Sequence, residues 1–218
     1  MNTILIGTPK IINSFGIKEK KIVNAPGELS IEIYNDKKIG KNNNVIIFNA
    51  DQNLVKTRVG LKWIYNKFPN INDIINIAEI VPINEMILKN HILIPKRILS
   101  LCDSPIEWNL EIKIPSILIH QSSQDALRNT IYENNLDFIY GDVLSINQLH
   151  NNARIMNELK NYNICDGLNN LAYIVNEFAE INKISIFNFF IGSPSKYILN
   201  KKLNINLIIK CLLDKIYQ

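Results

Sequence analysis

The stretch VIIFNADQNLVKTRVGLKWIYNKFPNINDIINIAEI (residues 45–80) decides the fold, because it joins two apolar runs through one amphipathic segment. Residues 44–50 and 73–78 read as buried strands. Between them, apolar side chains recur at helical spacing over 53–67, and Pro69 ends the predicted helix. A strand, a helix and a second strand in succession indicate an α/β protein.

The rest of the chain repeats this mixture of strands and helices. Apolar or alternating runs predict further strands at 2–7, 29–34, 91–95, 110–114, 137–143 and 184–192. The polar residues 35–38 (NDKK) follow one of these strands and make a hairpin plausible there. Helical periodicity predicts helices over 122–135, capped by Ser122 or Ser123, and over about 150–161, 166–182 and 204–217.

Several of the predicted strands are apolar on both faces, which indicates a sheet with helices on each side. We therefore expect a three-layer α/β fold in a single domain spanning residues 1–218. In such folds the loops at the carboxyl ends of the strands are the usual ligand site.

Composition excludes several classes of protein. The 218 residues are 47% hydrophobic and 20% charged, which is typical of a globular chain with a real core. The net charge of +4 is small, and the basic clusters at 17–21 and 35–41 contain no aromatic residues, so we expect no nucleic-acid partner. The three cysteines show no CxxC or Cys/His spacing, which predicts no metal site and reduced thiols in a cytoplasmic protein. No apolar run is long enough for a signal peptide or a membrane span, so no membrane partner is expected.

The serial order of the segments resembles the nucleoside phosphorylase/nucleosidase superfamily, which includes purine nucleoside phosphorylases and methylthioadenosine nucleosidases. The segments that carry the resemblance are 4–9 (ILIGTP), 45–80, 90–99 (NHILIPKRIL), 138–151 (FIYGDVLSINQLHN) and 165–195 (CDGLNNLAYIVNEFAEINKISIFNFFIGSPS). The resemblance implies a mixed, partly barrel-like sheet flanked by helices. It also implies a homo-oligomer, a dimer or a trimer-based assembly, and a purine-type nucleoside or nucleobase as ligand. No cofactor is implied, other than phosphate as co-substrate if the protein is a phosphorylase.

Cleavage of an N-glycosidic bond needs a proton donor for the departing base and anchors for the sugar hydroxyls, with either phosphate or an activated water. The resemblance places the family's acid on Ser193, its sugar-binding Glu on Leu168 and its water-activating Glu near Ile12. None of these three side chains carries a carboxylate. The family's glycine-rich turn falls on 51–53, and its glycine-rich strand exit falls on 79–81.

Three residues are candidates for a catalytic role. Ser193 could hydrogen-bond a base, or could be a turn residue before Pro194. Glu79 follows a buried strand and could be a relocated acid or sugar anchor, or a solvated loop carboxylate. His150 could be a general base, or a histidine that faces solvent at the start of a helix.

Ligand contacts are expected from six further residues. Asp166 could contact the ligand, although its position before an apolar periodic run is typical of a helix N-cap. Leu149 lies near the position of the family's base-stacking Phe. The remaining candidates are Gly7, Thr8, Asn147 and Leu168.

Three functions remain open from the sequence alone. The first is a divergent enzyme that cleaves a purine-type nucleoside with substituted residues such as Glu79 and His150. The second is a non-catalytic descendant that serves as a ligand-binding or oligomeric partner subunit. The third is an unrelated α/β binding module.

Overall fold

The computed structural model describes residues 2–7, 21–25, 29–34, 44–49, 53–87, 91–101, 115–146, 153–192 and 205–217. Within these ranges, ten strands belong to one sheet. They are β1 (Asn2–Gly7), β2 (Lys21–Ala25), β3 (Leu29–Tyr34), β4 (Asn44–Asn49), β5 (Ile71–Pro82), β6 (Ile92–Ser100), β7 (Ser116–Leu118), β8 (Phe138–Ser145), β9 (Gly167–Leu168) and β10 (Ser185–Gly192).

The sheet has an open half and a closed half that share β5. In the open half, β4, β1, β5 and β10 run parallel in that spatial order, and β3 and β2 extend it as antiparallel strands. In the closed half, β10 also pairs with β6, β6 with β8, β8 with β9, and β9 with β5. These five strands therefore close into a barrel, and the mixed, partly barrel-like sheet predicted from the sequence is confirmed.

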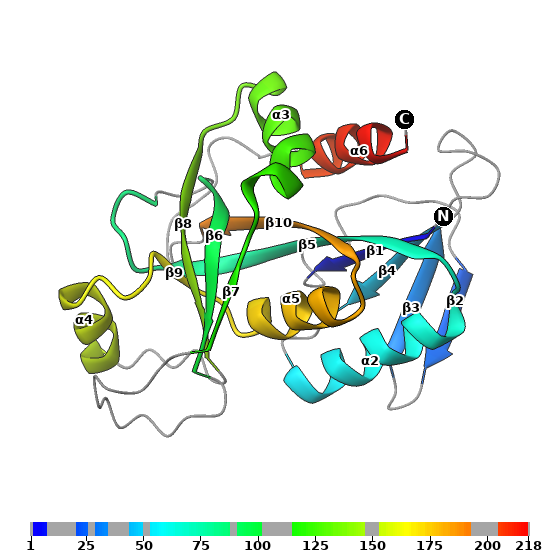
Figure 1. Cartoon of the computed structure of the whole chain (residues 1–218), viewed down its shortest axis with the longest axis horizontal. Helices are drawn as coiled ribbons and strands as arrows, with labels where there is room; N and C mark the ends of the chain where they lie inside the picture. Colours follow the sequence, from blue (N-terminus) through cyan, green and yellow to red (C-terminus); the bar gives the residue numbers. More distant parts are fainter. Residues whose placement is uncertain are drawn as a thin grey trace.

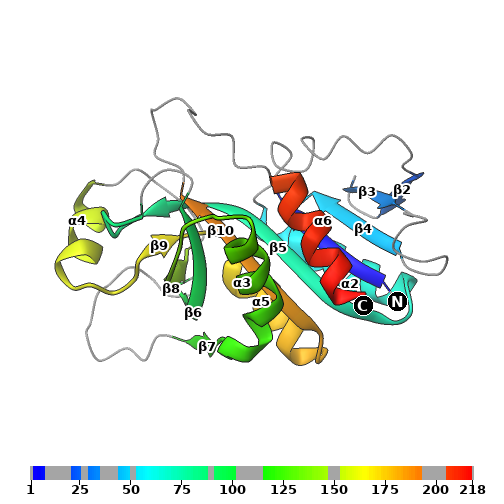
Figure 2. The same ribbon diagram turned by 90° about the horizontal axis from the view of Figure 1, so that it is seen from above.

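Helices cover both faces of the sheet. Helices α2 (Leu54–Lys67) and α5 (Ala172–Ile181) lie on one face, and α3 (Asp125–Glu133) and α6 (Ile205–Ile216) lie on the other (Figure 1). Helix α4 (Ala153–Asn161) lies at the barrel end of the molecule, away from α6, in both views (Figure 2). No helix of the described ranges is long and apolar enough to span a membrane.

Alternation along the strands sorts the core between these layers. In β1, Leu5 packs in the cluster beneath α3 and α6, whereas Ile4 and Ile6 pack in the cluster beneath α2 and α5. In β10, Phe190 belongs to a third cluster with barrel residues such as Leu93. Successive strand residues point to opposite faces, so both faces of each central strand are apolar and both are covered.

A network of buried side-chain amides lies where the barrel meets the open half. The Asn188 Oδ1 of β10 accepts hydrogen bonds from Asn76 Nδ2 (3.0 Å) and from Asn176 Nδ2 (3.1 Å). Gln124 pairs with the free edge of β10, where its Oε1 accepts from Asn188 N (3.1 Å) and its Nε2 donates to Ile186 O (2.6 Å). Gln124 thus replaces a neighbouring strand at the point where β6 has not yet begun to pair with β10.

Most predicted elements are confirmed, including the helix after residue 53 and the pairing of strand 29–34 with the strand that follows it. Asn53, not a glycine, begins α2, and its side chain accepts from Lys56 N (3.0 Å).

The predicted serine cap of the helix after residue 122 is wrong. A 3₁₀ turn (Gln121–Gln124) comes first, and Ser123 Oγ donates to His120 O (2.6 Å) instead of capping α3. The predicted strand at 110–114 lies outside the described residues.

We predict that Asn188→Leu lowers the free energy of unfolding by about 2–4 kcal/mol, because it leaves the amides of Asn76 and Asn176 buried with an unmet donor or acceptor. Urea denaturation followed by circular dichroism measures this change. The matched substitution Asn72→Leu, at an exposed position of β5, should change stability far less. Equal effects of the two substitutions would contradict a stabilising role for the network.

A second prediction concerns Asp73, a half-buried residue of β5 opposite Thr3 and Ser185. Burial raises the pKa of its carboxyl from 3.8 to about 6. The folded state therefore holds this proton more tightly than the unfolded state. Asp73 accordingly favours folding below pH 3.8, and this contribution is lost as the pH rises through about 6.

We expect Asp73→Asn to raise the melting temperature at neutral pH, with a gain that shrinks as the pH falls to 3.8. Thermal melts across this pH range test it. Asp214→Asn, at an exposed position of α6, is the control and should show no such trend. A gain from Asp73→Asn that is independent of pH would contradict the explanation.

Candidate functional site

The carboxyl ends of three parallel strands meet on β5. Gly7 ends β1 opposite Ile77, and Gly192 ends β10 opposite Ile80. Glu79 lies between these two positions and is half-buried. The fold thus brings together three of the predicted site segments at one edge of the sheet, which is the usual place for ligands in parallel α/β sheets.

Several predicted site residues, which follow β1, β8 or β10 in the sequence, lie outside the described residues. They are Thr8, Ile12, Asn147, Leu149, His150 and Ser193. Gly7, Glu79, Asp166 and Leu168 are the predicted site residues that the structure describes.

Asn169 joins the strand-end edge to the helix behind it. Its Nδ2 donates to Glu79 O (3.1 Å), and its Oδ1 accepts from Leu171 N (2.9 Å) and Ala172 N (2.8 Å). The side chain is 5% exposed. One amide therefore caps the first turn of α5 and also fixes the backbone of β5 at Glu79.

Ser145 holds the same helix from the other side. It ends β8, is fully buried, and its Oγ accepts from Tyr173 N (3.2 Å). The Ser145 side chain is therefore engaged by the helix. Asn169 was not singled out, because asparagine is so common in this chain that a buried one does not stand out.

Asp166 was predicted as the N-cap of a helix over 166–182, and this prediction is wrong. Asp166 instead precedes the short strand β9, and α5 begins six residues later, at Ala172. Its carboxylate accepts from Asn84 Nδ2 (2.8 Å) and from Asp142 N (2.8 Å), and its carbonyl accepts from Ile83 N (2.9 Å). The tertiary pairing of β9 with β5 and β8 replaces the helical turn that local propensity favours.

The position of the Asp166 carboxylate requires a glycine at residue 141. A Cβ at Gly141 would lie 2.6 Å from Asp166 Oδ2. The carboxylate therefore occupies the space that any other residue at position 141 would need.

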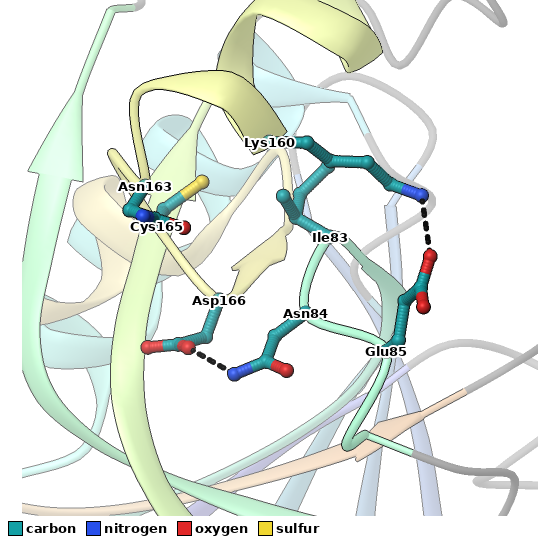
Figure 3. A pocket seen from close by; sticks show the side chains of 7 residues that line it. All are labelled: Ile83, Asn84, Glu85, Lys160, Asn163, Cys165 and Asp166. Atoms are coloured by element: carbon teal, nitrogen blue, oxygen red, sulfur yellow. Dashed lines mark hydrogen bonds and ion pairs between the residues drawn. The ribbon is translucent and has the colours of Figure 1, made fainter.

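A pocket of about 330 Å³ opens beside Asp166 (Figure 3). Its lining residues come from the end of β5, from the end of α4 and from the approach to β9: Ile83, Asn84, Glu85, Lys160, Asn163, Cys165 and Asp166. Lys160 Nζ and Glu85 Oε1 form an ion pair of 3.4 Å on one side of it. Asn84 and Asp166 are hydrogen-bonded on the other side.

The pocket is separate from the strand-end edge. Ile83 lies four residues beyond Glu79, a distance of roughly 13 Å along a strand. Burial raises the pKa of the Cys165 thiol in the pocket to about 12, assisted by the charges of Asp166 and Asp142. The thiol therefore stays protonated near neutral pH and is no nucleophile.

Leu168, on which the resemblance places the family's sugar-binding Glu, is 2% exposed. It packs in an apolar cluster with Ile83, Leu144 and Leu159. Its side chain offers no hydrogen bond to a sugar. Among the described residues, no group of three or more His, Cys, Asp or Glu side chains could hold a metal ion.

Comparisons with known proteins find the same fold at very low identity. No family model and no curated protein sequence matches the chain. Among solved structures, Helicobacter pylori MTAN matches with a TM-score of 0.77 and 11% identity over 99% of this chain and 100% of that one. The native futalosine hydrolase of Helicobacter pylori matches with a TM-score of 0.78 and 11% identity over 99% and 98%.

A third match, from Borrelia burgdorferi B31, is described as a 5'-methylthioadenosine/S-adenosylhomocysteine nucleosidase and is bound to adenine. It has a TM-score of 0.74 and 19% identity, and the alignment covers 99% of this chain and 100% of that one. The alignments span both chains almost completely, so the likeness includes the open half and the barrel. The chain therefore has the fold of these nucleosidases, as the resemblance predicted.

We predict that Asn169→Ala lowers the free energy of unfolding by about 2–3 kcal/mol, because α5 loses its cap and Glu79 O loses a donor. Asn169→Asp keeps the cap but not the donor, and should cost less. Chemical denaturation measures both variants beside Asn157→Ala, an exposed control in α4. A loss from Asn169→Ala no larger than that of the control would contradict the assigned role.

Proposed function

We propose that this protein binds a purine-type nucleoside or nucleobase at the carboxyl-end edge of β1, β5 and β10. The observation that carries the proposal is the match of the whole fold to nucleosidases, over 99% of this chain. Two of the matched structures hold adenine and 5'-methylthioadenosine, respectively. The carboxyl ends of β1, β5 and β10 lie together beside Glu79, and ligands of parallel α/β sheets usually bind at such an edge, which supports the proposal.

We propose that the ligand contacts come from residues at the strand ends and from residues that follow them in the sequence. Gly7 and Glu79 are the described contributors. The other proposed contributors are Thr8, which follows β1, Ser193, which follows β10, and Asn147, Leu149 and His150, which follow β8. Asp166 and Leu168 were also expected to contact the ligand. Their observed hydrogen bonds and packing support structural roles for these two residues.

For bond cleavage, we propose Glu79 and His150 as the catalytic residues. The departing base needs a proton, and the sugar develops positive charge that a carboxylate stabilises. The half-buried Glu79 could stabilise the positive charge as a carboxylate or, when protonated, donate the proton to the base. Such an enzyme would be a divergent nucleosidase, or a phosphorylase if phosphate replaces water.

A second candidate function is a non-catalytic binding or partner subunit of the same fold. The observation that favours it is Leu168, which is apolar and packed in the core where the family's sugar-binding carboxylate is expected. Ser193 also lacks the acidity of a general acid. We further propose a cytoplasmic homo-oligomer of single-domain chains for either function.

The deciding experiment incubates the protein with adenosine, inosine, uridine and 5'-methylthioadenosine, with and without phosphate. Chromatography detects free base, and thermal shift detects binding. We expect a purine nucleoside to raise the melting temperature more than uridine does. Absence of both a shift and base release for every purine compound would refute the proposed function.

The role of Glu79 is tested by Glu79→Gln. If the protein cleaves nucleosides through this carboxylate, base release should fall by about 10²–10⁴-fold, the usual contribution of general acid–base catalysis. Glu85→Gln is the control, since Glu85 is 89% exposed and lies at the separate pocket. Base release that Glu79→Gln leaves unchanged would remove Glu79 from the reaction, and binding without release would favour the non-catalytic function.

A further inference from the structure

Asn49 carries a buried acceptor without a donor. Its Oδ1 has no hydrogen-bond partner among the residues that the structure describes, and it is the only such buried side-chain atom there. Asn49 ends β4, and its neighbour across the sheet is Gly7, which ends β1. An unpaired buried acceptor costs folding free energy, so its presence at a strand end where ligands usually bind requires an explanation.

The face of the sheet on which Asn49 lies follows from its neighbours. Ile47, Leu5 and Ile77 all belong to the cluster beneath α3 and α6. Since side chains alternate, the residues two positions further along these strands lie on that same face. These residues are Asn49, Gly7 and Glu79.

Gly7, which has no side chain, therefore lies between the side chains of Asn49 and Glu79 on this face. The register pairs Gly7 with both Asn49 and Ile77, so Asn49 and Glu79 are two strands and two residues apart. This spacing corresponds to roughly 12 Å between their Cα atoms. Both side chains can therefore face one ligand that lies over Gly7.

We propose that Asn49 Oδ1 accepts a hydrogen bond from the ligand and that Asn49 and Glu79 together select a donor-bearing, uncharged ligand over an anion. The inference rests on the proposed function and specifies which hydrogen-bonding groups and which charge the site selects in its ligand. Hydroxyl groups of a sugar and the N–H groups of a purine are suitable donors. Inorganic phosphate would bring its negative charge to the face of the sheet that carries the Glu79 carboxylate, and should therefore bind less well than an uncharged nucleoside.

The experiment compares Asn49→Leu, which removes the acceptor, with Asn49→Asp, which keeps an acceptor of the same shape. The control is Asn44→Leu, at the opposite end of the same strand, where Asn44 Nδ2 donates to Asn2 Oδ1 (3.0 Å). Melting temperatures are measured without ligand, with adenosine, with adenine and with inorganic phosphate. Calorimetry gives the dissociation constant for adenosine.

In the absence of ligand, Asn49→Leu should leave the melting temperature unchanged or raise it, whereas Asn44→Leu should lower it. Asn49→Leu should weaken adenosine binding at least about tenfold, which corresponds to one hydrogen bond. Asn49→Asp should retain binding within a few-fold. Phosphate should neither stabilise the wild-type protein nor compete with adenosine.

Three results would overturn the inference: a loss of stability in ligand-free Asn49→Leu equal to that of Asn44→Leu, unchanged adenosine affinity in Asn49→Leu, or stabilisation of the wild-type protein by phosphate. Failure of the proposed function is a different result. The wild-type protein would then bind neither adenosine nor adenine. The ligand-free melts and the phosphate measurement would still decide whether Asn49 is an unpaired acceptor in an anion-rejecting site.

Discussion

Strand β5 is the element on which the rest of the structure depends, because it belongs to both halves of the sheet. It pairs with β1 between Ile71 and Ile77, with β10 over Asp73–Ile80, and with β9 at its last two residues. One strand of twelve residues can therefore continue the open parallel sheet and also close the barrel. Both faces of this strand must be apolar along most of its length, and seven of its residues are buried.

Buried amides solve the hydrogen-bonding problem that this arrangement creates. Before β6 begins to pair with β10, no described strand lies along the outer edge of β10, and Gln124 binds its backbone there. Between β9 and α5, Asn169 likewise accepts hydrogen bonds from backbone N–H groups, those of Leu171 and Ala172. Amides suit these positions because each one donates and accepts without carrying a charge into the core.

The described polar residues divide by whether their hydrogen bonds are complete. Asp166, Asn169 and Ser145 use their oxygens on backbone groups of the protein, so they hold the fold. Asn49 Oδ1 does not, among the described residues. This difference is the basis of the inference that Asn49, rather than these three residues, binds a ligand.

The sequence by itself determined the elements and the class of fold. Two buried strands joined by a helix that ends at Pro69, and the strand 184–192, are apolar enough to be recognised without the structure. The serial order of the segments also predicted the nucleosidase fold.

Only the tertiary structure decided which polar residues are already bound to the protein. Asp166 has the local pattern of a helix cap, but Gly167, which follows it, pairs with Val143 and Pro82, which lie 24 and 85 positions earlier in the chain. Such long-range pairing leaves no local signature, so the sequence could not show that Asp166 binds groups at the edge of the sheet, or that Asn49 Oδ1 lacks a donor among the described residues.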